Sequence, residues 1–204
     1  MIYKNNNNGG MKEGVKAENI IVLENASDYL SDNEFMELYE QLSQYDIHLK
    51  SFESHAPKAF LNDITVYISE NITELMIAGL FMPTIYDIIK SSMKIIIFKI
   101  RGKVKIVQAG KIREAVPCFN FKTKNGEIIA PIPSNLSEEQ FERYMDEIKG
   151  AIQSIQPNQQ TKYQSFVIEQ SEKFLKVEVK TMFQYANEKC QKQKNEKRRK
   201  ILLN

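Results

Sequence analysis

The stretch from residue 63 to residue 108 constrains the fold more than any other part of the chain. It begins with DITVYIS, whose apolar and polar residues alternate as in a strand with one buried face. The next segment, NITELMIAGLFMPTIYDIIKSS, is apolar on nearly every side of a helix, which is typical of a helix inside a core. Two strand-like segments follow, KIIIFKI and VKIVQ, separated by RGK. The predicted order is strand, helix, strand, strand.

Three features define the limits of this helix. Asn71 is in the position of an N-cap, and Glu74, three residues later, completes the pattern of a capping box. Pro83 removes one backbone donor and predicts a kink, or a split of the helix near Gly79. Charged residues interrupt the apolar run, so it is too short to span a bilayer. We therefore expect a core helix.

The residues before this stretch predict a strand, a helix and a second strand. Residues 20–23 are a short apolar run, and residues 47–52 alternate. Between them, Ser31 and Glu34 have the spacing of a capping box at the start of a helix. The complete order βαββαβ predicts an α+β fold of the ferredoxin-like type, which is an antiparallel sheet with both helices on one face.

A further hairpin and helix are predicted after this unit. CFNFKTK and EIIAPI are joined by Asn125-Gly126, and Asn-Gly is the strongest short hairpin signal. Pro131 near the end of the second strand is typical of a sheet edge. Ser137 and Gln140 repeat the capping-box spacing before an amphipathic helix.

The two ends of the chain differ from the middle. Residues 1–19 contain an Asn run and are expected to be a flexible N-terminal segment, whereas residues 20–157 are expected to form the globular domain. Residues 158–204 are rich in Lys, Gln and Glu and predict a long C-terminal helical extension, although FLKVEVK also fits a strand. The apolar residues of this extension that we expect to mediate association are Phe166, Phe174, Val177 and Phe183.

The net charge of +2 hides a segregation of charge along the chain. Residues 20–91 carry twelve acidic and three basic residues, whereas residues 92–136 carry nine basic and two acidic residues. Around RGK, cations occupy alternate positions, so period-two geometry predicts a basic ribbon. Such a face could follow phosphates, meet an acidic protein surface or protect a sheet edge. The predicted binding residues are Lys99, Arg101, Lys103, Lys105, Lys122, Lys124, Lys197, Arg198, Arg199 and Lys200.

No group of residues has the pattern of a catalytic or metal site. Ser54, His55 and Asp63 lie close in sequence, but there is no G-x-S-x-G elbow. Two cysteines and two histidines do not make a spaced zinc set. We therefore expect no catalytic residue, metal ion or cofactor. Glu178 and Lys180 match the E-x-K half of a metal-dependent nuclease site, but that site needs a second carboxylate, so a solvated helix face is favoured.

These observations predict a non-enzymatic interaction or assembly protein that associates with a protein partner, or with itself, through the C-terminal helix and the basic ribbon. Nucleic-acid binding by the ribbon and the basic C-terminus is the alternative, and a metal-dependent nuclease is the second alternative. An RNA-recognition domain would stack bases on aromatic residues of its central strands, and here the third strand offers Tyr67 alone. The lack of an apolar leader indicates the cytoplasm, and the abundant Asn, Lys and Ile indicate a bacterium or phage.

Overall fold

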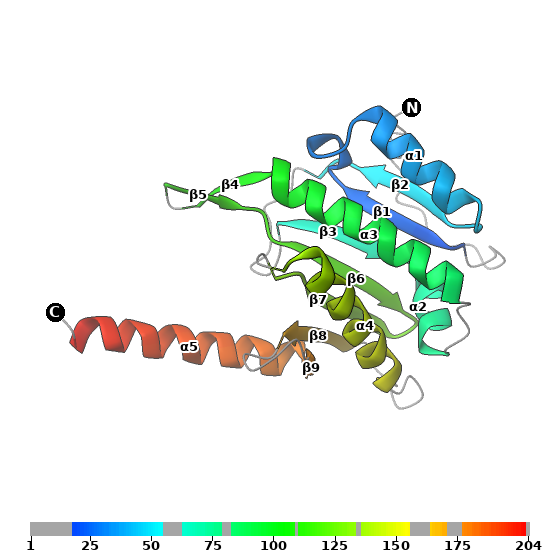
Figure 1. Ribbon diagram of the computed structural model, residues 1–204. Helices are drawn as coiled ribbons and strands as arrows, with labels where there is room; N and C mark the ends of the chain where they lie inside the picture. The colour runs from blue at the N-terminus through cyan, green and yellow to red at the C-terminus, as the bar shows by residue number, and fades with distance from the viewer. Residues whose placement is uncertain are drawn as a thin grey trace.

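The computed structural model describes residues 18–54, 63–78, 83–108, 110–133, 136–155, 164–170 and 177–202 (Figure 1). Seven strands form one sheet: β1 (Ile20–Glu24), β2 (His48–Phe52), β3 (Ile64–Ile68), β6 (Pro117–Thr123), β7 (Gly126–Pro131), β8 (Gln164–Gln170) and β9 (Val177–Thr181). Two further strands, β4 (Lys105–Gln108) and β5 (Lys111–Glu114), form a projecting hairpin. The helices are α1 (Asp32–Ser43), α2 (Glu70–Ile77), α3 (Pro83–Lys103), α4 (Glu138–Ser154) and α5 (Met182–Leu202), with a 3-10 turn at Ala26–Asp28. Within the described residues, no helix is long and apolar enough to cross a membrane.

The large sheet has the strand order β2-β1-β3-β6-β7-β8-β9. Parallel and antiparallel neighbours alternate across it. The pairs β1–β2, β3–β6 and β7–β8 are parallel, whereas β1–β3, β6–β7 and β8–β9 are antiparallel. Each parallel pair is joined by a helical crossover, which contains α1 in the first, α2 and α3 in the second, and α4 in the third. The fold therefore consists of three βαβ units side by side, followed by β9 and α5.

The predicted mixture of helices and strands is confirmed, but the antiparallel ferredoxin-like sheet is wrong, because the sheet is mixed. Helices α1, α3 and α4 cover one face of it (Figure 1). Strands β3 and β7 run in opposite directions. After each of them the chain crosses toward β9, with its helix on the same face of the sheet. The crossover through α4 therefore has the opposite hand from the other two, whereas βαβ crossovers are nearly always right-handed.

The main core lies between the sheet and these three helices. Leu23, Val66 and Phe119 of the sheet are fully buried in it. The rings of Phe98 in α3 and Phe141 in α4 meet edge to face, with their centroids 6.1 Å apart. Both of these helices are thus held against the same set of strands, which gives the body one continuous apolar centre.

The capping boxes predicted for α1 and α4 are both present. The backbone N–H of Ser31 donates to Glu34 at 2.8 Å, and the Ser31 hydroxyl accepts from the N–H of Glu34 at 3.4 Å. Ser137 and Gln140 form the equivalent bonds at 2.9 and 3.2 Å. Each box satisfies backbone donors that the first turn of a helix leaves unpaired, which explains why local sequence locates these two helix starts.

Two helices, α2 and α3, are present where we predicted one helix that is either kinked or split near Gly79. The N-cap of α2 is Ser69 rather than Asn71, and the Asn71 amide donates instead to Oδ1 of Asn19 at 2.6 Å. Pro83 is the first residue of α3, a position where its missing N–H breaks no helical bond. The predicted division near Gly79 is confirmed, and residues 79–82 lie outside the described part of the chain.

Helix α3 continues to Lys103, through the segment that we predicted as a strand and a turn. The apolar pattern of KIIIFKI also fits a helix, because its buried residues and the methionine before it are three or four positions apart. These fully buried residues are Met93, Ile96, Ile97 and Ile100. Gly102 lies in the last turn and does not end the helix early. The predicted hairpin at RGK is therefore wrong, and the basic ribbon that depended on it does not form.

The hairpin of β6 and β7 is confirmed, with its turn one residue earlier than predicted. The loop consists of Lys124 and Asn125, and Gly126 is the first residue of β7. Gly126 has φ 153°, and a Cβ atom there would lie 1.8 Å from the carbonyl oxygen of Gln164 in β8. Glycine is needed at this position because β8 approaches so closely. Strand β7 is an interior strand and not the edge that Pro131 indicated.

Residues 164–170 and 177–181 form strands where we predicted a helix, so the helical extension is limited to α5. The alternative interpretation of FLKVEVK as a strand is confirmed for its described residues, 177–180. Strands β8 and β9 extend the large sheet. Most of the predicted N-terminal segment, residues 1–17, lies outside the described part of the chain.

Helix α5 packs on the sheet face opposite the other helices. Ile168 of β8 belongs to the main core, so its neighbours Val167 and Glu169 point to the other face. Lys180 is the cross-strand partner of Val167 and points the same way. Glu169 and Lys180 both bind side chains of α5, which places this helix over the second face.

Candidate interaction surface

The hairpin β4–β5 is fixed to the body at its base. Arg113 donates to both carboxylate oxygens of Asp63 at 2.6 and 3.0 Å, and this bond raises the pKa of Arg113 above its ordinary value. Asp63 also accepts from the backbone N–H of Val116 at 2.7 Å. Ile106 packs against the main core. These contacts stabilise a two-stranded hairpin that would be marginal by itself.

One face of this hairpin combines two apolar side chains with two opposite charges. Val107 and Ile112 are cross-strand partners, and their side chains are 72% and 74% exposed. Lys105 and Glu114 are the partners two positions away, with Nζ and Oε1 3.4 Å apart. All four lie on one side of the ribbon, opposite Ile106 and Arg113. We call these four residues the outward face.

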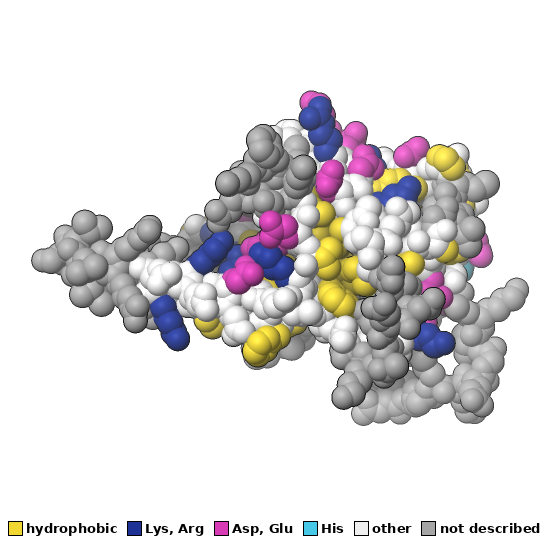
Figure 2. Space-filling view, turned by 90° about the horizontal axis from the view of Figure 1, so that it is seen from below, with side chains coloured by type: hydrophobic (Ala, Val, Ile, Leu, Met, Phe, Trp, Pro, Cys, Tyr) yellow, Lys and Arg dark blue, Asp and Glu magenta, His cyan; other side chains and the backbone are white. Residues whose placement is uncertain are grey.

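The first two turns of α5 fix this helix to β8 and β9. Tyr185 is buried there, Lys180 donates to Glu188 at 2.7 Å, and Lys189 donates to Glu169 at 2.7 Å. The hydrogen bond with Glu188 is the main cause that raises the pKa of Lys180. Burial raises the pKa of Glu169, but Lys189 and Lys180 outweigh it and hold that pKa below its ordinary value. Figure 2 shows acidic and basic side chains together beside the base of the projecting helix.

Beyond these turns, α5 extends past the ends of the strands and away from the body (Figure 1). We call residues 193–202 the arm, and they carry five Lys/Arg residues and one Glu. A helix this polar and this short is marginally stable in water without contacts from elsewhere. Phe183, in the first turn of α5, is 76% exposed.

The projecting hairpin and the first turn of α5 hold the most exposed large apolar side chains of the described residues. Val107, Ile112 and Phe183 are each more than 70% exposed, and the next, Met36, is 48% exposed. Hairpin and helix project from the same side of the body (Figure 1). Phe183 was among the predicted association residues. Val107 and Ile112 were missed, although VKIVQ-AG-KIRE has the pattern of two short strands around a glycine turn.

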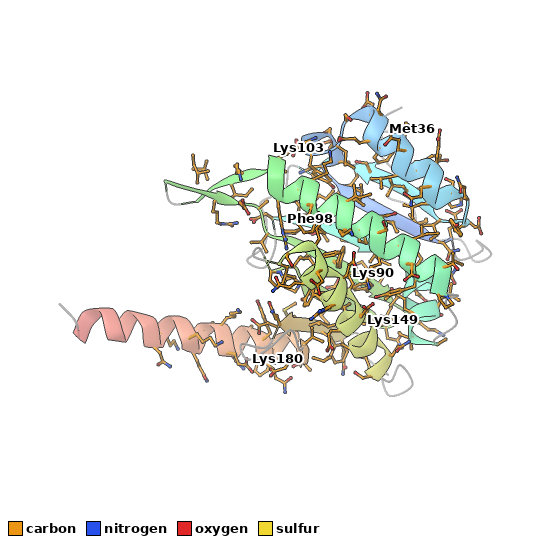
Figure 3. The ribbon with its side chains drawn as sticks, in the orientation of Figure 1. Met36, Lys90, Phe98, Lys103, Lys149 and Lys180 are labelled. Atoms are coloured by element: carbon orange, nitrogen blue, oxygen red, sulfur yellow. The ribbon has the colours of Figure 1, made fainter. Side chains whose placement is uncertain are left out.

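The cations predicted for the ribbon are separated and bound within the chain. Lys99 and Lys103 lie in α3, and both bind Glu34 of α1; Lys103 lies near the hairpin at the end of α3 (Figure 3). The hydrogen bond from Lys99, together with those from Ser31, lowers the pKa of Glu34 from 4.5 to about 2. Arg101 is buried and donates to the backbone carbonyl oxygens of Leu136 and Pro133, just before α4. Lys105 alone of the four remains on a hairpin.

The remaining predicted binding and association residues lie in several places. Lys122 binds Glu127 at 2.8 Å, and Lys124 is exposed in the β6–β7 turn. Lys197, Arg198, Arg199 and Lys200 lie in the arm, and their side chains are outside the described part of the structure. Phe166 in β8 and Val177 in β9 pack against the main core, and Phe174 lies outside the described residues. Those members of the predicted set whose side chains the structure describes therefore do not gather on one surface.

A polar cluster on the α5 side of the large sheet was not predicted. Glu127 accepts from Lys122, from Asn120 at 3.0 Å and from Ser165 at 3.3 Å. Burial raises the pKa of Glu127, but these three donors outweigh burial and lower it. The Lys122 ammonium also lies 5.5 Å from the centre of the Tyr67 ring. The cluster links β6, β7 and β8, and only the short spacing between Lys122 and Glu127 marks it in the sequence.

The residues that were considered for catalysis or metal binding make structural contacts instead. Lys180 is within 3.3 Å of Glu178 and also contacts Glu169 and Glu188. It is therefore one of the residues that fix α5 to the sheet, and Figure 3 shows it at the base of that helix. Asp63 is bound to Arg113, and His55 lies outside the described residues. In the described part of the chain, no three His, Cys, Asp or Glu side chains are placed to hold a metal ion.

No protein-family model matches the chain, and no curated protein or solved structure matches it.

Proposed function

We propose that this protein is a non-enzymatic, self-assembling interaction protein that uses the two elements projecting from its body, the hairpin β4–β5 and helix α5. The observation that carries this proposal is the concentration of exposed apolar side chains on these elements, at Val107, Ile112 and Phe183. Apolar surface gathered on projecting elements usually marks a contact with another protein.

The contacts that fix both elements to the body support the same proposal. Arg113 and Asp63 hold the hairpin, while Lys180, Glu188 and the buried Tyr185 hold α5. Elements that are already ordered lose less conformational entropy on binding than flexible loops do. A protein that presents two anchored elements on one side is suited to assembly in one orientation.

Sedimentation velocity over a range of concentrations tests the proposal. We expect the sedimentation coefficient to rise with concentration for the wild-type chain, and to rise less for a variant with Val107→Ser, Ile112→Ser and Phe183→Ser. Asp87→Asn, an exposed change elsewhere on the body, is the matched control and should behave as wild type. A wild-type chain that remains monomeric at about 0.5 mM, a concentration at which weak specific contacts form, would contradict self-assembly.

The charge of the arm supports nucleic-acid binding as a second candidate function. Five cations and one acid within ten residues make a strongly basic helix, and such helices bind phosphate backbones without sequence preference. Binding of this kind weakens log-linearly with salt. The test is fluorescence anisotropy with labelled single- and double-stranded DNA and RNA at two salt concentrations. Ending the chain after Gln191 should abolish binding, whereas replacing Lys105 and Lys124 with Gln should change it little.

A further inference from the structure

The outward face of β4–β5 has a charge arrangement that fits a second copy of itself. Lys105 lies on one strand, and Glu114 lies opposite it on the other strand, beside the apolar pair Val107 and Ile112. A two-fold axis along the hairpin would place β4 of one copy over β5 of the other. Each Lys105 would then meet Glu114 of the second copy, and Val107 would meet Ile112. An isologous contact requires this self-complementarity.

We infer that two copies of this chain form a two-fold dimer through the outward faces of their β4–β5 hairpins. The inference rests on the proposed self-assembly and names its interface. Lys105 and Glu114 make the outward face neutral, so a strongly acidic or basic partner would leave one of them beside a like charge. A second copy leaves no like charges together, which is why it fits this face better.

The hairpin is also ordered before any partner binds. Asp63 holds Arg113 on the opposite side of the ribbon, and Ile106 packs against the main core, so the outward face is left for contact. Gly110, with φ 74°, makes the tight turn that keeps Val107 and Ile112 in register. Because the hairpin and α5 project from the same side, the arms of both copies would point in the same direction (Figure 1).

Charge reversal tests the two-fold pairing, with sedimentation equilibrium as the measurement. Lys105→Glu alone or Glu114→Lys alone places like charges across the dimer contact, so each variant should be monomeric where wild type is dimeric. An equimolar mixture of the two variants should form dimers, because every contact between the copies then joins opposite charges. The double variant Lys105→Glu with Glu114→Lys should also form dimers.

The mixture separates contacts between copies from contacts within one hairpin. In both single variants the charges at positions 105 and 114 of the same chain repel each other, and mixing does not relieve that repulsion. Dimers that appear on mixing therefore report the pairing between copies. A mixture that stays monomeric, or a double variant that does, would overturn the inference.

A second pair of variants tests the apolar part of the contact. Val107→Ser with Ile112→Ser should raise the dimer dissociation constant by about 100-fold or more, and Phe183→Ser should leave it unchanged. If dimers survive the hairpin change and are lost with Phe183→Ser, the inference fails while self-assembly through α5 stands. A wild-type chain that is monomeric throughout would contradict both.

Discussion

Val167 and Ile168 are neighbours in β8, both are fully buried, and their side chains lie on opposite faces of the sheet. Ile168 belongs to the main core under α1, α3 and α4, whereas Val167 lies on the face over which α5 packs. Strand β8 therefore contributes to apolar packing on both sides, as an interior strand does. The C-terminal part of the chain begins inside the body and leaves it only with the arm.

This arrangement predicts opposite results for two truncations. A chain that ends after residue 191 loses the whole arm and should keep its fold and its melting temperature within a few degrees. A chain that ends after residue 159 loses β8 and β9 and should fail to fold cooperatively. Burying one Val or Ile side chain stabilises a protein by about 1.5–3 kcal/mol, a large fraction of a total of about 5–15 kcal/mol. Thermal unfolding followed by circular dichroism distinguishes these outcomes, and a cooperative transition in the shorter chain would contradict the prediction.

Gly126→Ala should destabilise the protein by roughly 2–4 kcal/mol, because the new Cβ would collide with backbone and the residue has positive φ. Gly150→Ala is the matched control. Gly150 lies inside α4, is exposed, and has nothing within 4 Å of an added Cβ, so this change should stabilise by about 0.5–1 kcal/mol. Urea denaturation measures both changes. Similar effects at the two positions would show that β8 does not approach Gly126 as closely as described.

The contact between Glu34 and Lys99 predicts a loss of stability in acid. The pKa of Glu34 is lowered from 4.5 to about 2 in the folded protein. The folded state therefore gains stability from this carboxylate above pH 4.5, and loses it as the pH falls toward 2. Glu34→Gln should flatten this part of the pH dependence, whereas Glu37→Gln, on the same helix, should not. Melting temperatures between pH 2 and pH 7 test this, and identical profiles for wild type and Glu34→Gln would contradict it.

Arg101→Met should reduce stability and leave nucleic-acid affinity unchanged. Arg101 is buried and donates to the carbonyl oxygen of Leu136 at 3.1 Å, so the change leaves buried acceptors unpaired at a cost of about 1–3 kcal/mol. Lys124→Met, in an exposed turn, is the control and should have little effect on stability. Chemical denaturation and anisotropy together provide the measurement. Weaker nucleic-acid binding by a fully stable Arg101→Met protein would restore the phosphate-binding role predicted from sequence.

Elements determined by neighbouring residues could be predicted from the sequence. The capping boxes at Ser31 and Ser137 lie within four residues of chain, and the turn at Asn125 within two, so their signals are local. KIIIFKI could not be assigned, because its apolar residues fit both a strand and a helix. The choice is decided by distant packing, such as that of Phe98 on Phe141.

Topology and the interaction surface depend on contacts that are distant in sequence. Asp63 and Arg113 are fifty residues apart, and nothing in either segment indicates that one fixes a hairpin to the other. The mixed sheet was missed for the same reason, since the choice of which strands pair is made by distant segments. Rules of handedness also do not favour the crossover through α4. The exposure of Val107 and Ile112 follows from the position of the hairpin, so the contact that we propose for them could not be inferred before that position was known.

The ion pairs that fix α5 to β8 and β9 have a consequence for the order of events during folding. Glu169 belongs to β8 and Lys180 to β9, so the arm can be held in place only after both strands have joined the sheet. Before that stage, the arm is a short polar helix that hardly persists in water. A chain that has not completed its sheet therefore cannot hold the arm in this orientation, and the contacts that we propose for the arm would select fully folded molecules.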